Sequence, residues 1–167
     1  RSLQASAQQL EKLALEDAMT GIANRRCFEQ VATQCLRACQ GDAGRPLCLA
    51  LIDVDRFKEV NDGHSHLVGD KVLQVIAALL SEHVRDEDLA ARLAGDEFVL
   101  VLRRTELTRA AEICDRVCLA VAHYNWQAIS PGLAVTISVG VAQSQAGDTL
   151  ESLVHRSDIA MYKRKAE

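Results

Sequence analysis

Adjacent carboxylates at the centre of residues 92–98 (Arg-Leu-Ala-Gly-Asp-Glu-Phe) give the strongest chemical signal in this sequence. Apolar runs at residues 89–93 and 98–102 flank a glycine that provides the backbone freedom of a tight turn. Because Mg2+ prefers hard oxygen ligands, Asp96 and Glu97 at the tip of such a hairpin suit a metal ion that holds a phosphate. Acidic residues are also common in plain solvated turns, so this interpretation needs support from elsewhere in the chain.

A second pair of carboxylates follows an unbroken apolar run at residues 47–54. The run is too short for a free-standing helix and suits a central strand that is buried on both faces. Asp53 and Asp55 stand at its carboxyl end, an unusual place for acidic residues in a buried strand. Asp53 and Asp96 can therefore converge on one metal ion from neighbouring strands.

Periodic apolar patterns predict the elements that must position these groups. Residues 133–142 alternate apolar with small or polar residues, as in a strand with one core face. Amphipathic helices are expected at four further places: residues 26–39, 70–84, 106–121 and 149–165. This order, with a hairpin in the middle, predicts an α+β fold in which helices pack over a sheet. Residues 1–16 are helical, with leucines near heptad spacing, and suit the end of a coiled-coil stalk from an upstream domain.

Composition limits the class of protein. The 167 residues suit one domain, and 49% hydrophobic but only 4% aromatic residues predict an aliphatic core. A net charge of −4 argues against broad nucleic-acid binding, and neither a membrane span nor a secretory signal is visible. We expect a cytoplasmic domain cut from a longer protein, without membrane contact of its own.

The six cysteines allow two interpretations. Two pairs are spaced i,i+4, which on a helix offers two thiolates to zinc. The same residues fall on the apolar stripes of their helices, where a free thiol behaves as a small hydrophobe, and this interpretation implies a reducing cytosol. The cysteines are Cys27, Cys35, Cys39, Cys48, Cys114 and Cys118.

Several motifs in fixed order resemble the GGDEF domain. They are Asp17-x-Met-Thr-Gly-Ile-x-Asn-Arg-Arg-x-Phe28, Asp53-x-Asp-x-Phe-Lys-x-x-Asn-Asp62, Gly69-Asp70, Arg92-x-Ala-Gly-Asp-Glu-Phe98, Thr136-Ile-Ser-Val-Gly140 and Ala160-Met-Tyr162-x-x-Lys165. The resemblance implies a mostly antiparallel five-stranded sheet flanked by helices, similar to adenylyl cyclases and polymerase palms, with a ferredoxin-like core. It places the GGDEF domain at residues 17–167, after the helix at residues 1–16.

Active GGDEF domains are diguanylate cyclases, so the resemblance also implies chemistry. They condense two GTP molecules into cyclic di-GMP with release of pyrophosphate, as homodimers that use Mg2+ or Mn2+. By resemblance Asp53, Asp96 and the carbonyl of Val54 bind metal, and Glu97 is a further catalytic residue. The role of Glu97, as a base or as a second metal ligand, stays open.

The resemblance assigns nucleotide contacts as well. Asn61 and Asp70 align with residues that bind guanine. By resemblance, the main chain at Arg56, Phe57 and Lys58 and the side chains of Lys58 and Lys165 bind phosphates. Gly95 is a further nucleotide-binding residue, where the backbone and the nucleotide approach closely. Taken singly, Lys165 is equally a solvated lysine, and Asn61 or Asp70 a helix cap.

Residues 85–88 (Arg-Asp-Glu-Asp) resemble the RxxD inhibitory site of the family, where product binds. Arg85 suits a guanine edge or a phosphate, Asp88 can accept from guanine nitrogens, and Arg116 falls where the family has another basic ligand. Charges before a strand are otherwise merely solvated.

Two positions depart from the family pattern. Ala94 replaces the first glycine of the signature, and Ser65 replaces a glycine in the loop after Asn61. A positive φ at Ala94 would cost about 1–2 kcal/mol, so we expect slowed or normal catalysis. The alternatives are a degenerate domain that senses cyclic di-GMP or GTP, and a structural dimerisation domain. An upstream sensory or receiver domain is the expected partner.

Overall fold

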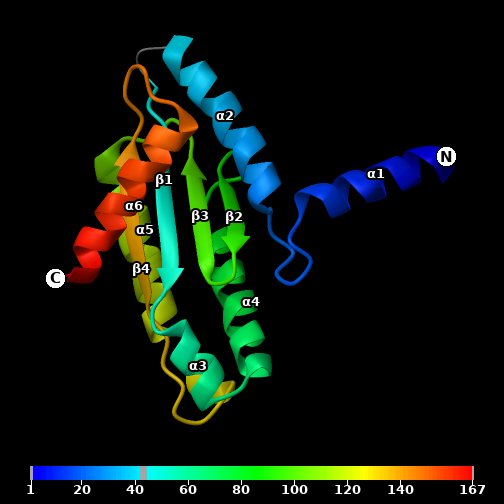
Figure 1. Cartoon of the computed structure of the whole chain (residues 1–167), viewed down its shortest axis with the longest axis vertical. Helices are drawn as coiled ribbons and strands as arrows, with labels where there is room; N and C mark the ends of the chain where they lie inside the picture. Colours follow the sequence, from blue (N-terminus) through cyan, green and yellow to red (C-terminus); the bar gives the residue numbers. More distant parts are fainter. Residues whose placement is uncertain (1, 42–44, 167) are drawn as a thin grey trace.

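Helices pack on both faces of one sheet, as Figure 1 shows. The computed structural model describes residues 2–41 and 45–166. The helices are α1 (Ser2–Leu15), α2 (Arg25–Gly41), α3 (Phe57–Gly63), α4 (His66–Glu82), α5 (Leu107–His123) and α6 (Leu150–Ala166), with a 3-10 turn η1 (Trp126–Ala128). The strands are β1 (Cys48–Val54), β2 (Leu89–Ala94), β3 (Glu97–Leu102) and β4 (Ile137–Gln143).

The sheet has four strands in the order β2-β3-β1-β4, and every neighbouring pair is antiparallel. The expected α+β class is confirmed, but the expected count of five strands is wrong for the described residues. Beyond β2, isolated bridges join Ala91 to Ala23 in parallel and Ala23 to Glu16 in antiparallel orientation, and neither forms a strand. Residues 133–136 precede β4 without pairing as a strand, although Leu133 and Val135 are buried.

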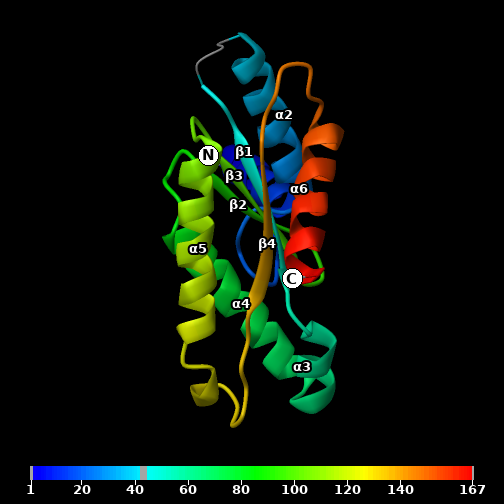
Figure 2. The ribbon, with the colours of Figure 1, turned by 90° about the vertical axis from the view of Figure 1, so that its left-hand side faces the viewer.

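Strand β1 is buried on both faces because helices cover both sides of the sheet, seen edge-on in Figure 2. Its residues Ala50 and Ile52 join the core formed with α4 and α5. The alternate residues Leu49 and Leu51 join a second core formed with α2 and α6. Side chains of a strand point to opposite faces in turn, which explains why the whole run is apolar.

Helix α6 lies directly against β4. A Cβ atom at Gly140 would stand 2.1 Å from the carbonyl oxygen of Ser157 and 2.2 Å from the amide nitrogen of Met161, so only glycine permits this approach. At the start of α6, Arg156 binds Asp148 through both guanidinium nitrogens. That hydrogen bonding, aided by the Gln145 amide and Ser152, lowers the pKa of Asp148 to about 2.

Most predicted elements are present, with shifted ends. The helix expected from residue 70 begins four residues earlier at His66, because Ser65 caps it by accepting a hydrogen bond from the Val68 amide. The short helix α3 was not predicted. All six cysteines are free, and Cys35, Cys48 and Cys114 are buried, as the interpretation of these thiols as small hydrophobes predicts.

Helix α1 projects away from the body of the domain, and none of its residues is buried (Figure 1). Leu3, Leu10 and Leu13 are 85%, 68% and 65% exposed. The coiled-coil stalk remains a prediction that these bare leucines suit. Among the described residues, no helix has the length and apolarity needed to cross a membrane.

Ser65 gives a test of the glycine-to-serine departure. Its φ of 156° and ψ of 165° lie in a region that is almost exclusive to glycine and costs other residues about 1–3 kcal/mol. Ser65→Gly should stabilise the domain by about 1 kcal/mol in urea unfolding, since glycine caps helices nearly as well as serine. Ser65→Ala, the control, loses the cap and keeps the strain, so it should destabilise. Equal effects of the two variants would contradict this account.

Candidate active site

The predicted catalytic carboxylates meet at one end of the sheet. Asp53 and Glu97 are Cα partners in the pairing of β1 with β3, and paired residues of antiparallel strands project from the same face. The next amide along β1, that of Val54, donates to the carbonyl oxygen of Asp96 at 3.2 Å. The sheet register therefore brings Asp53 together with Asp96 and Glu97, which lie more than forty positions further along the chain.

The half-buried carboxylate of Asp96 is held close to that of Asp53, which disfavours the charged form of Asp96. Burial raises the pKa of Asp96 to about 6, with further contributions from a hydrogen bond to Asp53, from the charge of Asp53 and from that of Glu97. Lys165 reaches from α6 to Asp53 and forms an ion pair with its carboxylate. This hydrogen bond raises the pKa of the Lys165 ammonium. The site thus holds excess negative charge that one lysine partly offsets.

This donor set fits a divalent cation. Two carboxylates forced together in a half-buried place are relieved by a metal ion, which offsets both charges. Among residues 2–41 and 45–166, no group of three or more His, Cys, Asp or Glu side chains is arranged to bind a metal ion. Mg2+ does not require one, because it is usually held by one or two carboxylates together with phosphate oxygens and water.

Asp55 contributes to the same edge in a way that the sequence interpretation missed. Its carboxylate accepts hydrogen bonds from the hydroxyls of Thr136 (2.7 Å) and Ser138 (2.5 Å), and its amide donates to the carbonyl of Thr136. These bonds fasten β4 to the end of β1. The two aspartates of this motif therefore have different roles: Asp53 lies with the other predicted site residues, and Asp55 holds β4 against the end of β1.

Asn61 and Asp70 lie on neighbouring helices and cap neither of them. Asn61 is inside α3, and its side chain fills the space that a Cβ of Gly69 would need, since its Oδ1 would stand 1.9 Å from that atom. Asp70 follows directly in α4 and is exposed. The helix-cap alternative is thus wrong for both, because Ser65 caps α4 and Arg56 precedes α3.

A cleft of about 890 Å³ lies beside Asp55, along α3 and the segment before β4. Its lining includes Asp55, Arg56 and Lys165, together with Arg164, which the sequence interpretation did not select. Arg56 has a left-handed backbone (φ 53°) that turns the chain from β1 into α3. Lys58 is exposed in the first turn of that helix. Two of the predicted phosphate contacts, Arg56 and Lys165, therefore face one cleft.

The alanine in the signature does not strain the hairpin. Positive φ values at non-glycine residues occur, in the described chain, at Arg56, Ser65 and Arg104, and not at Ala94. Within the turn it is Gly95 that has a positive φ, of 48°. The predicted conformational cost at Ala94 is therefore wrong, and its methyl group is exposed at the turn.

An ion pair that the sequence interpretation left without a role holds the hairpin. Arg92 donates through Nε to the carbonyl of Gly95 (2.9 Å) and through Nη1 to Asp17 (3.2 Å). Burial acts to raise the pKa of Asp17, but hydrogen bonds from Thr20 and Arg92 outweigh it and lower the pKa. Both residues lie within the quoted motifs, but they are 75 positions apart and their opposite charges alone do not identify them as a pair.

The residues predicted for inhibition surround a separate cavity of about 320 Å³, whose lining includes Arg85, Asp88 and Arg116. Asp88 is not merely solvated: its side chain is fully buried and accepts from Arg85 and from the amide of Arg103. Arg85 also donates to Thr105. The cavity lies where β2 begins, at the end of the sheet away from the catalytic carboxylates.

Arg92 should control the order of the hairpin. Arg92→Met keeps the apolar stem but removes the bonds to Gly95 and Asp17, so amide hydrogen exchange at residues 94–97 should accelerate about tenfold, as expected when roughly 1–1.5 kcal/mol is lost. Arg26→Met removes a charge from the same surface and serves as the control. Equal exchange in the two variants would show that Arg92 does not hold the hairpin.

Comparisons with known proteins agree with this geometry. The family described as "Diguanylate cyclase, GGDEF domain" matches residues 14–167. Diguanylate cyclase DgcP of Pseudomonas aeruginosa is 35% identical over 152 residues, covering 91% of this chain and 22% of the relative. The response regulator PleD of Caulobacter vibrioides is 39% identical over 160 residues, covering 93% and 35%. The chain therefore spans well under half the length of these curated relatives.

A solved structure is similar over nearly the entire chain. The coiled coil and GGDEF domain of DgcB from Caulobacter crescentus, in complex with c-di-GMP, superposes with a TM-score of 0.89 at 25% identity. The match covers 99% of this chain and 87% of that one. With the catalytic motifs in register along the same sheet, this chain belongs to the GGDEF domain family of diguanylate cyclases.

Proposed function

We propose that this domain is an active diguanylate cyclase that joins two GTP molecules into cyclic di-GMP and pyrophosphate. The observation that carries the proposal is the convergence of Asp53, Asp96 and Glu97 at one end of the sheet. A domain that only binds nucleotide has no need to hold carboxylates against their mutual repulsion. Ala94, the main departure from the family, leaves the hairpin without backbone strain.

Asp53, Asp96 and the Val54 carbonyl would hold Mg2+ or Mn2+, which when bound offsets phosphate charge and lowers the pKa of the attacking 3′-hydroxyl. Glu97 is exposed beside them and is free to accept a proton or to bind a second ion. Lys165 neutralises Asp53 in this structure. Its ammonium group suits the triphosphate, which brings far more negative charge to the same cleft.

Guanine selection is assigned to Asn61 and Asp70. A carboxylate can accept from both N1 and N2 of guanine, an arrangement that adenine cannot match. Gly69 makes room for the Asn61 side chain between α3 and α4, directly beside Asp70. The main chain at residues 56–58 and the side chains of Lys58 and Lys165 would bind phosphates.

Each domain offers one such site, so the reaction requires two copies with their sites facing each other. The exposed leucines of α1 suit a parallel pairing that brings two domains together. An upstream sensory or receiver domain would control that pairing. The alternative function, a sensor that binds GTP or cyclic di-GMP without turnover, is separated from the cyclase by the first test below.

Substituting single carboxylates tests the cyclase directly. In a form joined through α1 to a parallel coiled coil, Asp53→Asn and Glu97→Gln should each lower cyclic di-GMP formation from GTP and Mg2+ more than about 100-fold. Chromatography of the nucleotides gives the rate. Asp62→Asn, an exposed carboxylate on α3 without an assigned role, is the control and should leave the rate unchanged. An inactive wild-type dimer that still binds GTP would favour the sensor.

We further propose that cyclic di-GMP inhibits this domain from the cavity of Arg85, Asp88 and Arg116. This cavity lies at the other end of a sheet whose seven-residue strand β1 spans roughly 20 Å. Product bound there cannot block GTP directly. Inhibition should therefore act by holding two domains apart, and GTP affinity of a single domain should not change.

Arg116 is the cleanest residue for testing this site. It is exposed on α5, whereas Arg85 and Asp88 also bond to the main chain near Arg103. Arg116→Ala should weaken cyclic di-GMP binding about tenfold in calorimetry, since a lost charged hydrogen bond costs roughly 1.5–3 kcal/mol. Asn61→Ala, the matched change at the proposed guanine site, should not. The reverse result would show that product binds at the guanine site instead.

A further inference from the structure

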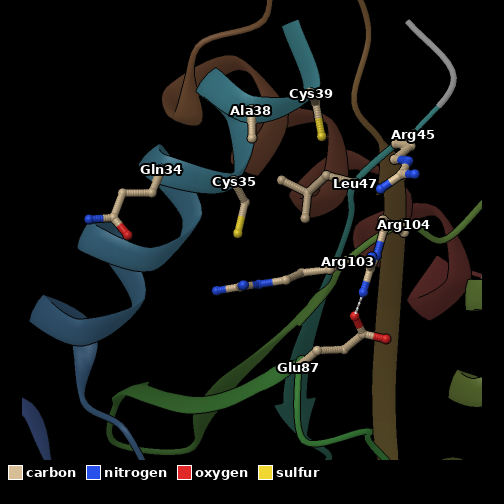
Figure 3. A pocket seen from close by; sticks show the side chains of 9 residues that line it. All are labelled: Gln34, Cys35, Ala38, Cys39, Arg45, Leu47, Glu87, Arg103 and Arg104. Atoms are coloured by element: carbon tan, nitrogen blue, oxygen red, sulfur yellow. Dashed lines mark hydrogen bonds and ion pairs between the residues drawn. The ribbon is translucent and has the colours of Figure 1, made fainter. Parts of the chain in front are cut away.

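A cavity without an assigned role lies between α2 and the turn that follows β3 (Figure 3). Its volume of about 440 Å³ is within the range of small-molecule sites, roughly 300–1,000 Å³. It lies at the end of the sheet opposite the catalytic carboxylates, where Cys48 pairs with Leu102. The lining combines an apolar wall with a basic side: Cys35, Ala38 and Leu47 against Arg45, Arg103 and Arg104.

Arg103 brings a charge into this cavity without a counter-charge. Its side chain extends beneath Cys35 toward α2, as Figure 3 shows, and its Nε is buried without a hydrogen-bond partner. No carboxylate of the described residues forms an ion pair with it. Burial raises the pKa of the Cys35 thiol despite the opposing effect of Arg103, so this neighbour is neutral. Because Arg103 lines the cavity and forms no ion pair with the described residues, its guanidinium group is available to an anion that enters the cavity.

Arg104 is presented to the same cavity by an unusual backbone. Its φ of 48° is uncommon for a residue with a side chain and directs the arginine toward Glu87, with which it forms an ion pair. Glu87 is shared, because Arg85 also approaches it at 3.1 Å. One carboxylate therefore serves two arginines, and Arg104 remains available to a stronger anion.

A phosphate meets these requirements better than a carboxylate. It carries nearly two negative charges and three acceptor oxygens, so it can accept from Arg103 and Arg104 together. The planar guanidinium fork suits phosphate geometry. The apolar wall of Cys35, Ala38 and Leu47 then faces whatever the phosphate is attached to, which favours an organic phosphate with a flat apolar part.

We propose that this cavity binds a small organic phosphate of the nucleoside monophosphate class. Arg103 and Arg104 hold the phosphate, and the base lies against the wall formed by α2 and Leu47. The site is distinct from the catalytic cleft and from the cavity of Arg85, Asp88 and Arg116, although Arg104 lines both cavities at this end of the sheet. Binding here does not depend on cyclase activity.

Adenosine 5′-monophosphate is a suitable probe, because it lacks the guanine edge that Asn61 and Asp70 would bind. Titration into the labelled protein should shift the amide resonances of Gln34, Cys35 and Arg103 in two-dimensional NMR spectra. Inorganic phosphate should bind the same place more weakly. Shifts confined to residues 61–70, or no shifts at millimolar nucleotide, would overturn the proposal, and equal affinity for inorganic phosphate would overturn the assignment to an organic phosphate.

Two variants test the charge and the space separately. Arg103→Gln should weaken the nucleotide at least about tenfold, as the loss of a charged hydrogen bond predicts. Ala38→Phe fills the cavity from an exposed helix position, so it should weaken binding while the fold is kept. Arg37→Gln, a matched change at an exposed arginine of α2 outside this lining, is the control and should bind normally. Affinity that survives both Arg103→Gln and Ala38→Phe, or falls with Arg37→Gln, would contradict the site.

Discussion

Repulsion between Asp53 and Asp96 is the constraint on which the organisation of the catalytic edge depends. Two carboxylates at a half-buried place separate unless the backbone that carries them is fixed. Strand β1 provides this rigidity, because cores on both of its faces leave no room for the strand to shift. The Val54–Asp96 hydrogen bond then ties the two residues at the main chain. The unfavourable free energy of this charge repulsion is thus offset by the burial of apolar side chains elsewhere in the sheet.

Interactions from three other segments complete this edge. Asp55 fastens β4, Gly140 lets α6 approach β4 so that Lys165 reaches Asp53, and the Asp17–Arg92 pair fixes the hairpin to the chain that leaves α1. The last contact matters for control. It links the segment that follows α1 to the hairpin turn, so in the proposed dimer a change in the pairing of α1 would be transmitted to Gly95.

The convergence of the three carboxylates was predictable from the sequence, because its signals are local and chemically distinctive. Apolar patterns located all four strands, and the spacing of the motifs related Asp53, Asp96 and Glu97 to the GGDEF family. The sequence did not show which residues pair within the sheet. Nothing in residues 133–136, for example, indicates that they stay unpaired before β4. The short helix α3 has too few turns to display a period. Ion pairs such as Asp17–Arg92 join distant segments, so only the fold reveals them.

The two departures from the family pattern are absorbed differently, for reasons of backbone geometry. Ala94 has a φ that any residue adopts, so its methyl group matters only if it meets a nucleotide. Ser65 occupies a conformation suited to glycine and partly compensates by capping α4 through Val68. The strain therefore falls beside α3 and α4, which carry the residues proposed to bind guanine, and not at the carboxylates. Strain at Ser65 would therefore alter the affinity for the guanine base before it altered the rate of catalysis.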